Sequence, residues 1–245
     1  MQVRVFTHRD RPEFGNRLSE LEGDSFPPYL LHDGFDECRP HLFDEFADLQ
    51  LYVVAAEDDT LLGTGNALPY CVEAGRPLPA FQELLTGAPR QHAQGIAPNM
   101  LCPIQAMVVG DARGTGVSGE IMAAYNEIAA KHGFKTIGVP VRPTLKPRYP
   151  ITPIDRYVAW TRADGSRFDP WLRQQERMGS RFVEIHHAST VIEGSISDWQ
   201  GWTGMEFPES GEYVIPDGHV PLVVDRDQNL GRYAEPHVWY VREVG

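Results

Sequence analysis

Apolar residues alternate along some stretches of the chain and recur at helical spacing along others, so the pattern predicts both strands and helices. The expected strands cover residues 2–8, 51–73 as a pair joined by a turn at 57–60, 100–110, 135–141, 181–196, 219–227 and 235–244. The expected helices cover residues 13–23, 40–49, 117–131 and 169–179, with shorter pieces in 79–87 and 153–165. No segment repeats, which argues against a repeat array.

Residues 100–141 form the most regular block of the chain. The apolar run at 100–110 predicts a buried central strand, and a glycine-rich segment follows it. Residues 117–131 then predict an amphipathic helix that ends at Gly133, and residues 135–141 predict the next strand. This strand–loop–helix–strand order is the clearest organising feature of the sequence.

Two segments lack a regular pattern. Residues 74–99 are rich in Pro, Gly and Ala, and we interpret them as a loop insertion rather than a domain boundary. Residues 142–153 contain four prolines, which excludes regular structure there. We therefore expect one domain, 1–245, with N-terminal strands and helices in 1–99, a core in 100–142 and an elaborated part in 143–245.

The composition is that of a folded protein, with 42% apolar and 23% charged residues. A net charge of −12 disfavours nucleic acid and anionic membranes as partners, because both require clustered Lys and Arg. Three scattered cysteines do not support a disulfide framework. The histidines outside residues 186 and 187 show no spacing typical of metal ligands, which argues against a metal site. No apolar run suits a membrane span, and the first residues lack a secretion signal, so we expect a cytoplasmic protein.

The segment Gly114–Gly119 reads G-x-G-x-x-G between a strand and a helix, a pattern typical of dinucleotide binding. Residues 110–113 separate it from the strand, and only one such block occurs in the chain. The next strand ends at Arg142 rather than at the acidic residue typical of NAD binding. Because an arginine there suits a 2′-phosphate, NADP is an open alternative. A plain strand–helix turn is a second alternative. A third is a backbone nest for a pyrophosphate, with Arg113 as an added donor.

The block from residue 107 to 141 resembles the GNAT acetyltransferase superfamily, whose acyl-CoA signature is Gln/Arg-x-x-Gly-x-Gly/Ala between a strand and a helix. Here Gly114 and Gly116 match the two small positions, whereas Asp111 stands at the position of Gln or Arg. The order of strands and helices also agrees over most of the chain. The resemblance implies a GNAT-like α/β fold, with a mixed, mostly antiparallel sheet flanked by helices and a loop-rich C-terminal part.

The resemblance also implies acetyl-CoA, or another acyl-CoA, as co-substrate. Its pantetheine would pair with the strand before the loop, and its pyrophosphate would lie on the loop and the first helical turn. The residues implied in CoA binding are Met107, Val108, Val109, Arg113, Gly114, Thr115, Gly116, Val117 and Ser118.

Catalytic residues are harder to assign. The family often uses a tyrosine as general acid, but Gln175 stands at that position here, and an amide has no titrating proton. We take His186, His187 and Thr144 as the candidates, because histidine titrates near neutral pH and Thr144 follows the strand after the motif helix. Packing histidines and a turn threonine are the plain alternatives. Tyr157 is a substitute acid or, more simply, a packing aromatic.

All five tryptophans fall after residue 142, in Pro- and Gly-rich surroundings. They form either a roof over the acyl site or a second core layer. This half resembles, more faintly, the GNAT-like domains of natural-product assembly. We expect an N-acetyltransferase that transfers the acyl group directly to a small-molecule or carrier-bound acceptor. The alternatives are a thioester decarboxylase or S-acyltransferase acting on malonyl-CoA or a carrier protein, and a non-catalytic acyl-CoA-binding module. The acceptor and the oligomeric state, monomer or homodimer, are open.

Overall fold

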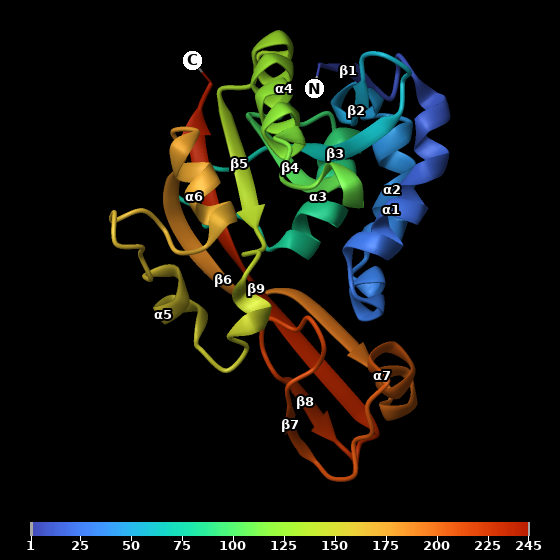
Figure 1. Cartoon of the computed structure of the whole chain (residues 1–245), viewed down its shortest axis with the longest axis vertical. Helices are drawn as coiled ribbons and strands as arrows, with labels where there is room; N and C mark the ends of the chain where they lie inside the picture. Colours follow the sequence, from blue (N-terminus) through green and yellow to red (C-terminus); the bar gives the residue numbers. More distant parts are fainter. Residues whose placement is uncertain (1, 245) are drawn as a thin grey trace.

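The computed structural model describes residues 2–244, apart from the side chains of residues 19, 20, 23 and 24. Within this part, one nine-stranded sheet runs through the molecule in the order β1-β2-β3-β4-β5-β9-β8-β7, with β6 paired to β9 (Figure 1). The strands are β1 (Val3–Thr7), β2 (Leu51–Ala55), β3 (Leu61–Tyr70), β4 (Met100–Val108), β5 (Thr136–Val141), β6 (Arg181–Gly194), β7 (Gly211–Tyr213), β8 (Leu222–Asp225) and β9 (Leu230–Glu243). Only β4 and β5 pair in parallel.

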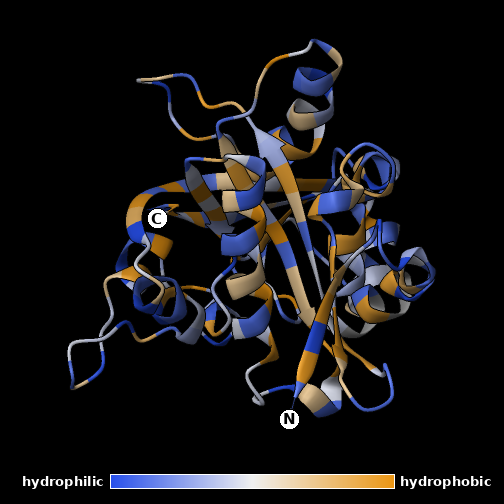
Figure 2. Cartoon of the chain, turned by 90° about the horizontal axis from the view of Figure 1, so that it is seen from above, coloured by the Kyte–Doolittle hydropathy of each residue, from blue (hydrophilic) through white to orange (hydrophobic). Residues whose placement is uncertain are grey.

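Helices cover this sheet, so the expected mixed, mostly antiparallel α/β fold is confirmed. They are α1 (Leu18–Ser25), α2 (Phe35–Phe43), α3 (Phe81–Ala93), α4 (Val117–His132), α5 (Ile154–Val158), α6 (Pro170–Arg177) and α7 (Ile196–Thr203). Helix α4 packs across β2 to β5. It lies close to β3 because Gly65 has no side chain: a Cβ there would come within 2.6 Å of Ile121 Cγ2. Figure 2 shows apolar residues along the central strands and polar residues on the outer loops.

Three expectations about the elements were wrong. The helix expected at 40–49 is α2, which begins at Phe35 because Gly34, at φ +94°, turns the chain and the Asp33 carboxylate accepts the Phe35 N–H. The loop expected at 74–99 does contain a helix at the short piece expected at 79–87, but this helix, α3, is longer, is amphipathic and packs on β3 and β6. No element was expected between the strands at 181–196 and 219–227, where the structure has α7 and β7.

Strands β6 and β9 extend beyond the main sheet and form a C-terminal lobe with β7, β8 and α7 (Figure 1). This lobe has its own apolar core, to which the short 3-10 helix Pro28–His32 contributes. The buried members of that core are Tyr29, Leu30, Ile192, Ile196, Trp199, Phe207, Ile215, Leu222, Val224 and Tyr233. Trp199 therefore belongs to a second core layer, which is one of the two interpretations given above for the tryptophans.

A gap in the sheet separates the main sheet from the C-terminal lobe. The β5–β9 ladder ends at Val141 and Val238, whereas the β8–β9 ladder ends at Val223 and Arg232. Residues 233–237 of β9 consequently have no strand partner on that edge within the described chain. None of the helices between residues 2 and 244 has the length and apolar content to span a bilayer.

Candidate active site

Strands β4 and β5 pair at one end only and part along the rest of their length. Their parallel ladder ends at Leu101 and Ile137. Each strand then carries a proline, Pro103 or Pro140, which has no N–H to offer a neighbouring strand. Since β4 still pairs with β3 as far as Val108, only its inner edge is open in the described part of the chain. An extended ligand can pair with such an edge as an added strand would.

The glycine loop lies at the end of β4 and leads into α4. Gly114 (φ +79°) and Gly116 (φ +98°) adopt left-handed conformations, and a Cβ at either position would meet no atom within 4 Å. Gly116 is the N-cap of α4 and supplies no side-chain cap. The N–H groups of Val117 and Ser118 in the first turn therefore have no partner from within the helix. This arrangement of donors at a helix N-terminus suits a pyrophosphate.

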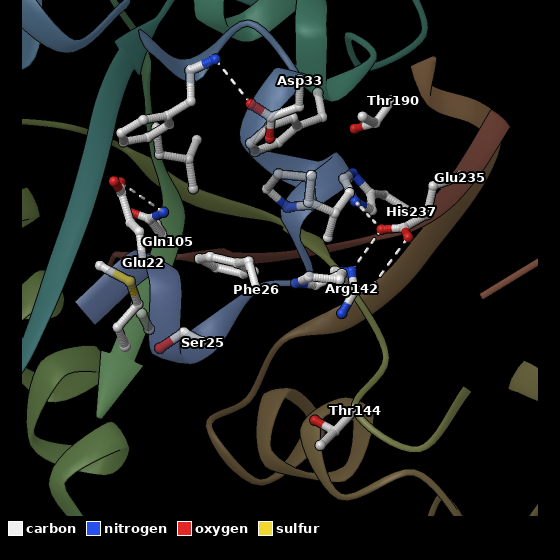
Figure 3. Close-up of a pocket in the computed structure, with 18 of the residues that line it drawn as sticks. Glu22, Ser25, Phe26, Asp33, Gln105, Arg142, Thr144, Thr190, Glu235 and His237 are labelled. Atoms are coloured by element: carbon white, nitrogen blue, oxygen red, sulfur yellow. Dashed lines mark hydrogen bonds and ion pairs between the residues drawn. The ribbon is translucent and has the colours of Figure 1, made fainter. Parts of the chain in front are cut away.

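A cavity of about 1020 Å³ extends from this loop to the C-terminal lobe. Its loop end is lined by Met107, Val108, Arg113 and Ser118, and its middle by β4 and the chain between α1 and α2. Its far end is polar (Figure 3). The polar residues of that far end are Asp33, Arg142, Thr190, Asp217, Glu235 and His237.

The ion pair of Arg142 with Glu235 fills the gap between β5 and β8. Arg142 Nε lies 2.7 Å from Glu235 Oε1, and Nη2 lies 3.2 Å from Oε2. Nη2 also donates to the main-chain oxygen of Asp217 at 3.2 Å. Burial alone would raise the pKa of the Glu235 carboxyl, but attraction to Arg142 outweighs it and holds the pKa well below its usual range. Glu235 is therefore a buried, ionised carboxylate whose counter-ion faces the cavity.

Further buried polar groups surround Glu235. The Tyr233 hydroxyl donates to its carboxylate, and the His219 N–H donates to the Tyr233 oxygen at 2.8 Å. His237 Nε2 lies 3.5 Å from Glu235 Oε1. Lys146, fully buried, donates to the main-chain oxygen of His219, and burial lowers its pKa to about 8. These contacts fix the junction between the main sheet and the C-terminal lobe.

The opposite wall of the cavity is acidic. Glu22 of α1 and Asp36 of α2 both accept from Arg39 Nη2, at 2.6 and 2.8 Å. Asp33, in the turn before α2, accepts a backbone N–H at 2.9 Å through Oδ1. Burial raises the pKa of Asp33 to about 7, against the opposing effect of that hydrogen bond. The cavity thus carries more carboxylates than its arginines neutralise.

The residues expected to bind CoA occupy one continuous stretch beside the cavity. Met107, Val108, Arg113 and Ser118 line it directly, and Arg113 Nε donates to Val108 O at 3.3 Å. The remaining expected residues follow the backbone between them without lining the cavity: Val109, Gly114, Thr115, Gly116 and Val117. Their part in CoA binding stays a prediction.

The three catalytic candidates are not brought together. Thr144 is exposed and lines the cavity. His186 and His187 lie on β6 outside the lining. His186 Nε2 is 3.8 Å from Glu184, and His187, 64% exposed, has Nε2 at 3.6 Å from Asp155. The structure therefore places neither imidazole where an acceptor in the cavity would meet it.

Gln175, at the family's general-acid position, and Tyr157, the substitute acid considered, both lie outside the cavity lining. Gln175 is fully buried in α6, and its amide N and O have no partner among the described residues. Tyr157 is 1% exposed and donates to Asp169 Oδ2 at 2.7 Å, as expected of a packing aromatic. Neither side chain offers a proton to the cavity.

Sequence reasoning missed the far end of the cavity. The residues it did not single out are Glu22, Asp33, Thr190, Glu235 and His237. They come from α1, the turn before α2, β6 and β9, and no local motif links them. Arg142 was considered for a 2′-phosphate, but it is paired with Glu235 here. The grouping is a tertiary feature, in which the gap in the sheet leaves Glu235 and His237 without a strand neighbour on one side.

Comparison with known proteins finds a relative in sequence and several solved structures of similar fold. No family model matches the chain. The arginine N-acetyltransferase AvaD of Aspergillus versicolor is 28% identical over 224 residues, which cover 81% of this chain and 77% of AvaD. The loading GNATL domain of CurA from Lyngbya majuscula superposes with a TM-score of 0.64 at 12% identity, over 100% of this chain and 98% of that domain. The GphF GNAT-like decarboxylase in complex with isobutyryl-CoA gives 0.56 at 15% identity, over 100% of both chains.

Proposed function

Since this chain has the fold of the GNAT superfamily, we propose that it is an acyl-CoA-dependent N-acyltransferase that acetylates a small cationic amine. One observation carries the proposal: a single cavity joins the glycine loop and the open edge of β4 to an acidic wall. The first part suits the acyl donor and the second suits a cation. Their continuity allows direct transfer without a covalent enzyme intermediate.

The acyl donor would bind mainly to backbone groups. The pantetheine arm of acetyl-CoA would pair with the inner edge of β4 at Met107 and Val108, and its pyrophosphate would lie on the loop from Arg113 to Ser118. The splay of β4 and β5 provides the width for that arm. The thioester would then face the middle of the cavity, between β4 and the chain that connects α1 to α2.

The charge of the cavity indicates where the acceptor would bind. Among the described residues, five carboxylates line the cavity: Glu22, Asp33, Asp36, Asp217 and Glu235. Away from the glycine loop, the arginines among them are Arg39 and Arg142, and each already pairs with a carboxylate. The surplus negative charge favours a cationic acceptor. The relative AvaD is named for arginine acetylation, and this supports arginine or a similar basic amine as the acceptor.

The alternative is thioester chemistry on malonyl-CoA or a carrier protein. The fold likeness to a GNAT-like decarboxylase favours it. The acidic wall opposes it, because the malonyl carboxylate would face Asp33 and Glu22 at the point where the thioester ends.

An assay with acetyl-CoA and thiol detection separates the two activities. Arginine, ornithine, agmatine and a neutral amino acid are supplied as acceptors, and malonyl-CoA is supplied alone with mass-spectrometric detection of acetyl-CoA. We expect thiol release with the basic acceptors only. Acetyl-CoA formed from malonyl-CoA, with no acetylated amine, would replace the proposal by the alternative. Calorimetric CoA binding without turnover of either kind would indicate a binding module.

A further inference from the structure

We infer that Asp33 is the catalytic base that removes the proton from the acceptor ammonium group. The inference rests on the proposed N-acyltransferase function. An amine bound as an ammonium ion has no lone pair for attack on a thioester, so a proton acceptor must lie within hydrogen-bond reach of it. The cavity is where that group has to be found.

Asp33 is a half-buried lining carboxylate with an open oxygen. Its Oδ1 accepts the Phe35 N–H at 2.9 Å, whereas Oδ2 has no hydrogen-bond partner among the described residues. Figure 3 shows this carboxylate among the side chains that line the cavity. The residue is half-buried, so it is partly shielded from water yet reachable by an acceptor.

The other titratable groups of the acidic wall and the junction are either paired with arginine or unsuitably placed. Glu22 and Asp36 hold Arg39, and Glu235 holds Arg142. His237 lines the cavity, but its Nδ1 is buried without a partner and its Nε2 faces Glu235 at 3.5 Å. Asp217, in the loop before β8, is exposed at the rim. His237 Nδ1 has almost no accessible surface, so a bound acceptor does not reach it, and none of the other groups combines an open oxygen with a partly sheltered position.

The backbone of Asp33 is fixed from two sides. Gln82 Nε2 of α3 donates to Asp33 O and to Val191 O of β6, both at 3.0 Å, and Gln82 Oε1 accepts the Val191 N–H at 2.9 Å. Gly34, at φ +94°, then turns the chain into α2. Anchoring of this kind holds a catalytic side chain at one distance from its substrate.

The charges around Asp33 suit a base at neutral pH. The charged and titratable groups that line the cavity on the elements around it are Glu22 on α1, Asp36 and Arg39 on α2, Arg142 after β5, and Glu235 and His237 on β9. Burial raises its pKa to about 7, and the neighbouring carboxylates Glu235, Glu22 and Asp36 add to that rise. A base with this pKa both accepts a proton and releases it again near neutrality.

The reaction balances with this single base. The ammonium proton passes to Asp33 Oδ2, and the freed lone pair forms the C–N bond to the thioester carbonyl carbon. The C–S bond breaks, the thiolate leaves, and it takes the second proton of the attacking nitrogen. Asp33 then returns its proton to water. The products are the amide, CoA thiol and one released proton.

Steady-state kinetics on Asp33→Asn, with the best basic acceptor, test the inference. We expect kcat to fall by about 10²–10⁴-fold with little change in the acceptor KM. The wild-type kcat should rise with pH through about 7, since the base acts in its deprotonated form, and this limb should vanish in Asp33→Asn. Glu37→Gln, an exposed carboxylate on α2, the helix that follows Asp33, is the matched control and should keep kcat. Asp36→Asn, a cavity carboxylate, should raise KM rather than lower kcat.

A second measurement uses the substrate. An aminooxy analogue of the acceptor carries an unprotonated nitrogen at neutral pH, so its acetylation should lose far less rate in Asp33→Asn than that of the amine. Unchanged kcat in Asp33→Asn, with an active wild type, overturns the role of Asp33 alone. A wild type that acetylates no basic acceptor overturns the proposed function and the inference together.

Discussion

The two ends of the cavity are built on different principles. The glycine-loop end is one continuous segment, residues 107–118, and its donors are mainly backbone groups at a helix N-terminus. The far end is assembled from side chains distant in sequence: Arg142 and Glu235 are 93 residues apart. The charge of Glu235 is buried, and its stability depends on the pairing with Arg142. The loop end thus depends on local conformation, whereas the far end depends on the whole fold.

Arg142→Gln should give the largest effect, because it leaves Glu235, 1% exposed, without its counter-ion. Removal of one partner of a buried pair costs about 3–5 kcal/mol. We expect a loss of this size in the free energy of unfolding, measured by urea denaturation followed by tryptophan fluorescence.

The double variant Arg142→Gln, Glu235→Gln serves as the control, since it removes both charges and should recover much of the loss. Equal stability of Arg142→Gln and the wild type would show that Glu235 is not held as an ion, and the contrast between the two ends would then fail.

Gly116→Trp should abolish CoA binding at the other end. The bulky side chain would enter the space where a Cβ now meets no atom within 4 Å. We expect a loss of at least about 100-fold in CoA affinity, or about 2.7 kcal/mol, by isothermal titration calorimetry.

The positive φ of Gly116 complicates this test, because any L-residue there is strained by about 1–2 kcal/mol. Gly116→Ala carries the same strain without the bulk, and it should keep most of the affinity. Similar affinities of Gly116→Trp and the wild type would mean that the loop is only a strand–helix turn.

The same contrast explains what the sequence could predict. The loop end could be predicted from the sequence because Gly114, Gly116 and the apolar stripe of α4 are adjacent in sequence. Their conformations depend on these residues themselves rather than on distant parts of the chain. The far end was inaccessible because Asp33 and Glu235 carry no local signal, and their proximity arises from the gap along β9. His186 and His187 illustrate the limit: their chemistry was suitable, but strand pairing and a bulge decide which β6 residues reach the cavity.

Asp33→Asn should stabilise the fold at alkaline pH. The folded-state pKa of Asp33, about 7, lies above that of an unfolded aspartate. Between these two values the native state binds more protons than the unfolded state, so stability falls as pH rises. We expect the variant to be more stable than the wild type by about 1–2 kcal/mol at pH 8, after allowance for partial exposure, and equal to it below pH ~4. Thermal unfolding across this pH range measures the difference, and a constant difference at all pH values would contradict the raised pKa.

Arg113→Gln should give the smallest effect and separates the two ends by their response to salt. Arg113 is exposed at the loop end, where it would meet the pyrophosphate in water. Such a contact contributes about 0.2–1 kcal/mol and is screened by salt, with a Debye length of about 10 Å at 0.1 M and 3 Å at 1 M. We expect CoA affinity to fall by no more than about 5-fold at low salt, with the difference disappearing near 1 M salt, as measured by calorimetry. The stability loss of Arg142→Gln should persist at the same salt, because its charges are shielded from solvent ions. If both variants lost their effect in salt, the far end would be solvated like the loop end, and the cavity would have no sheltered site for proton transfer.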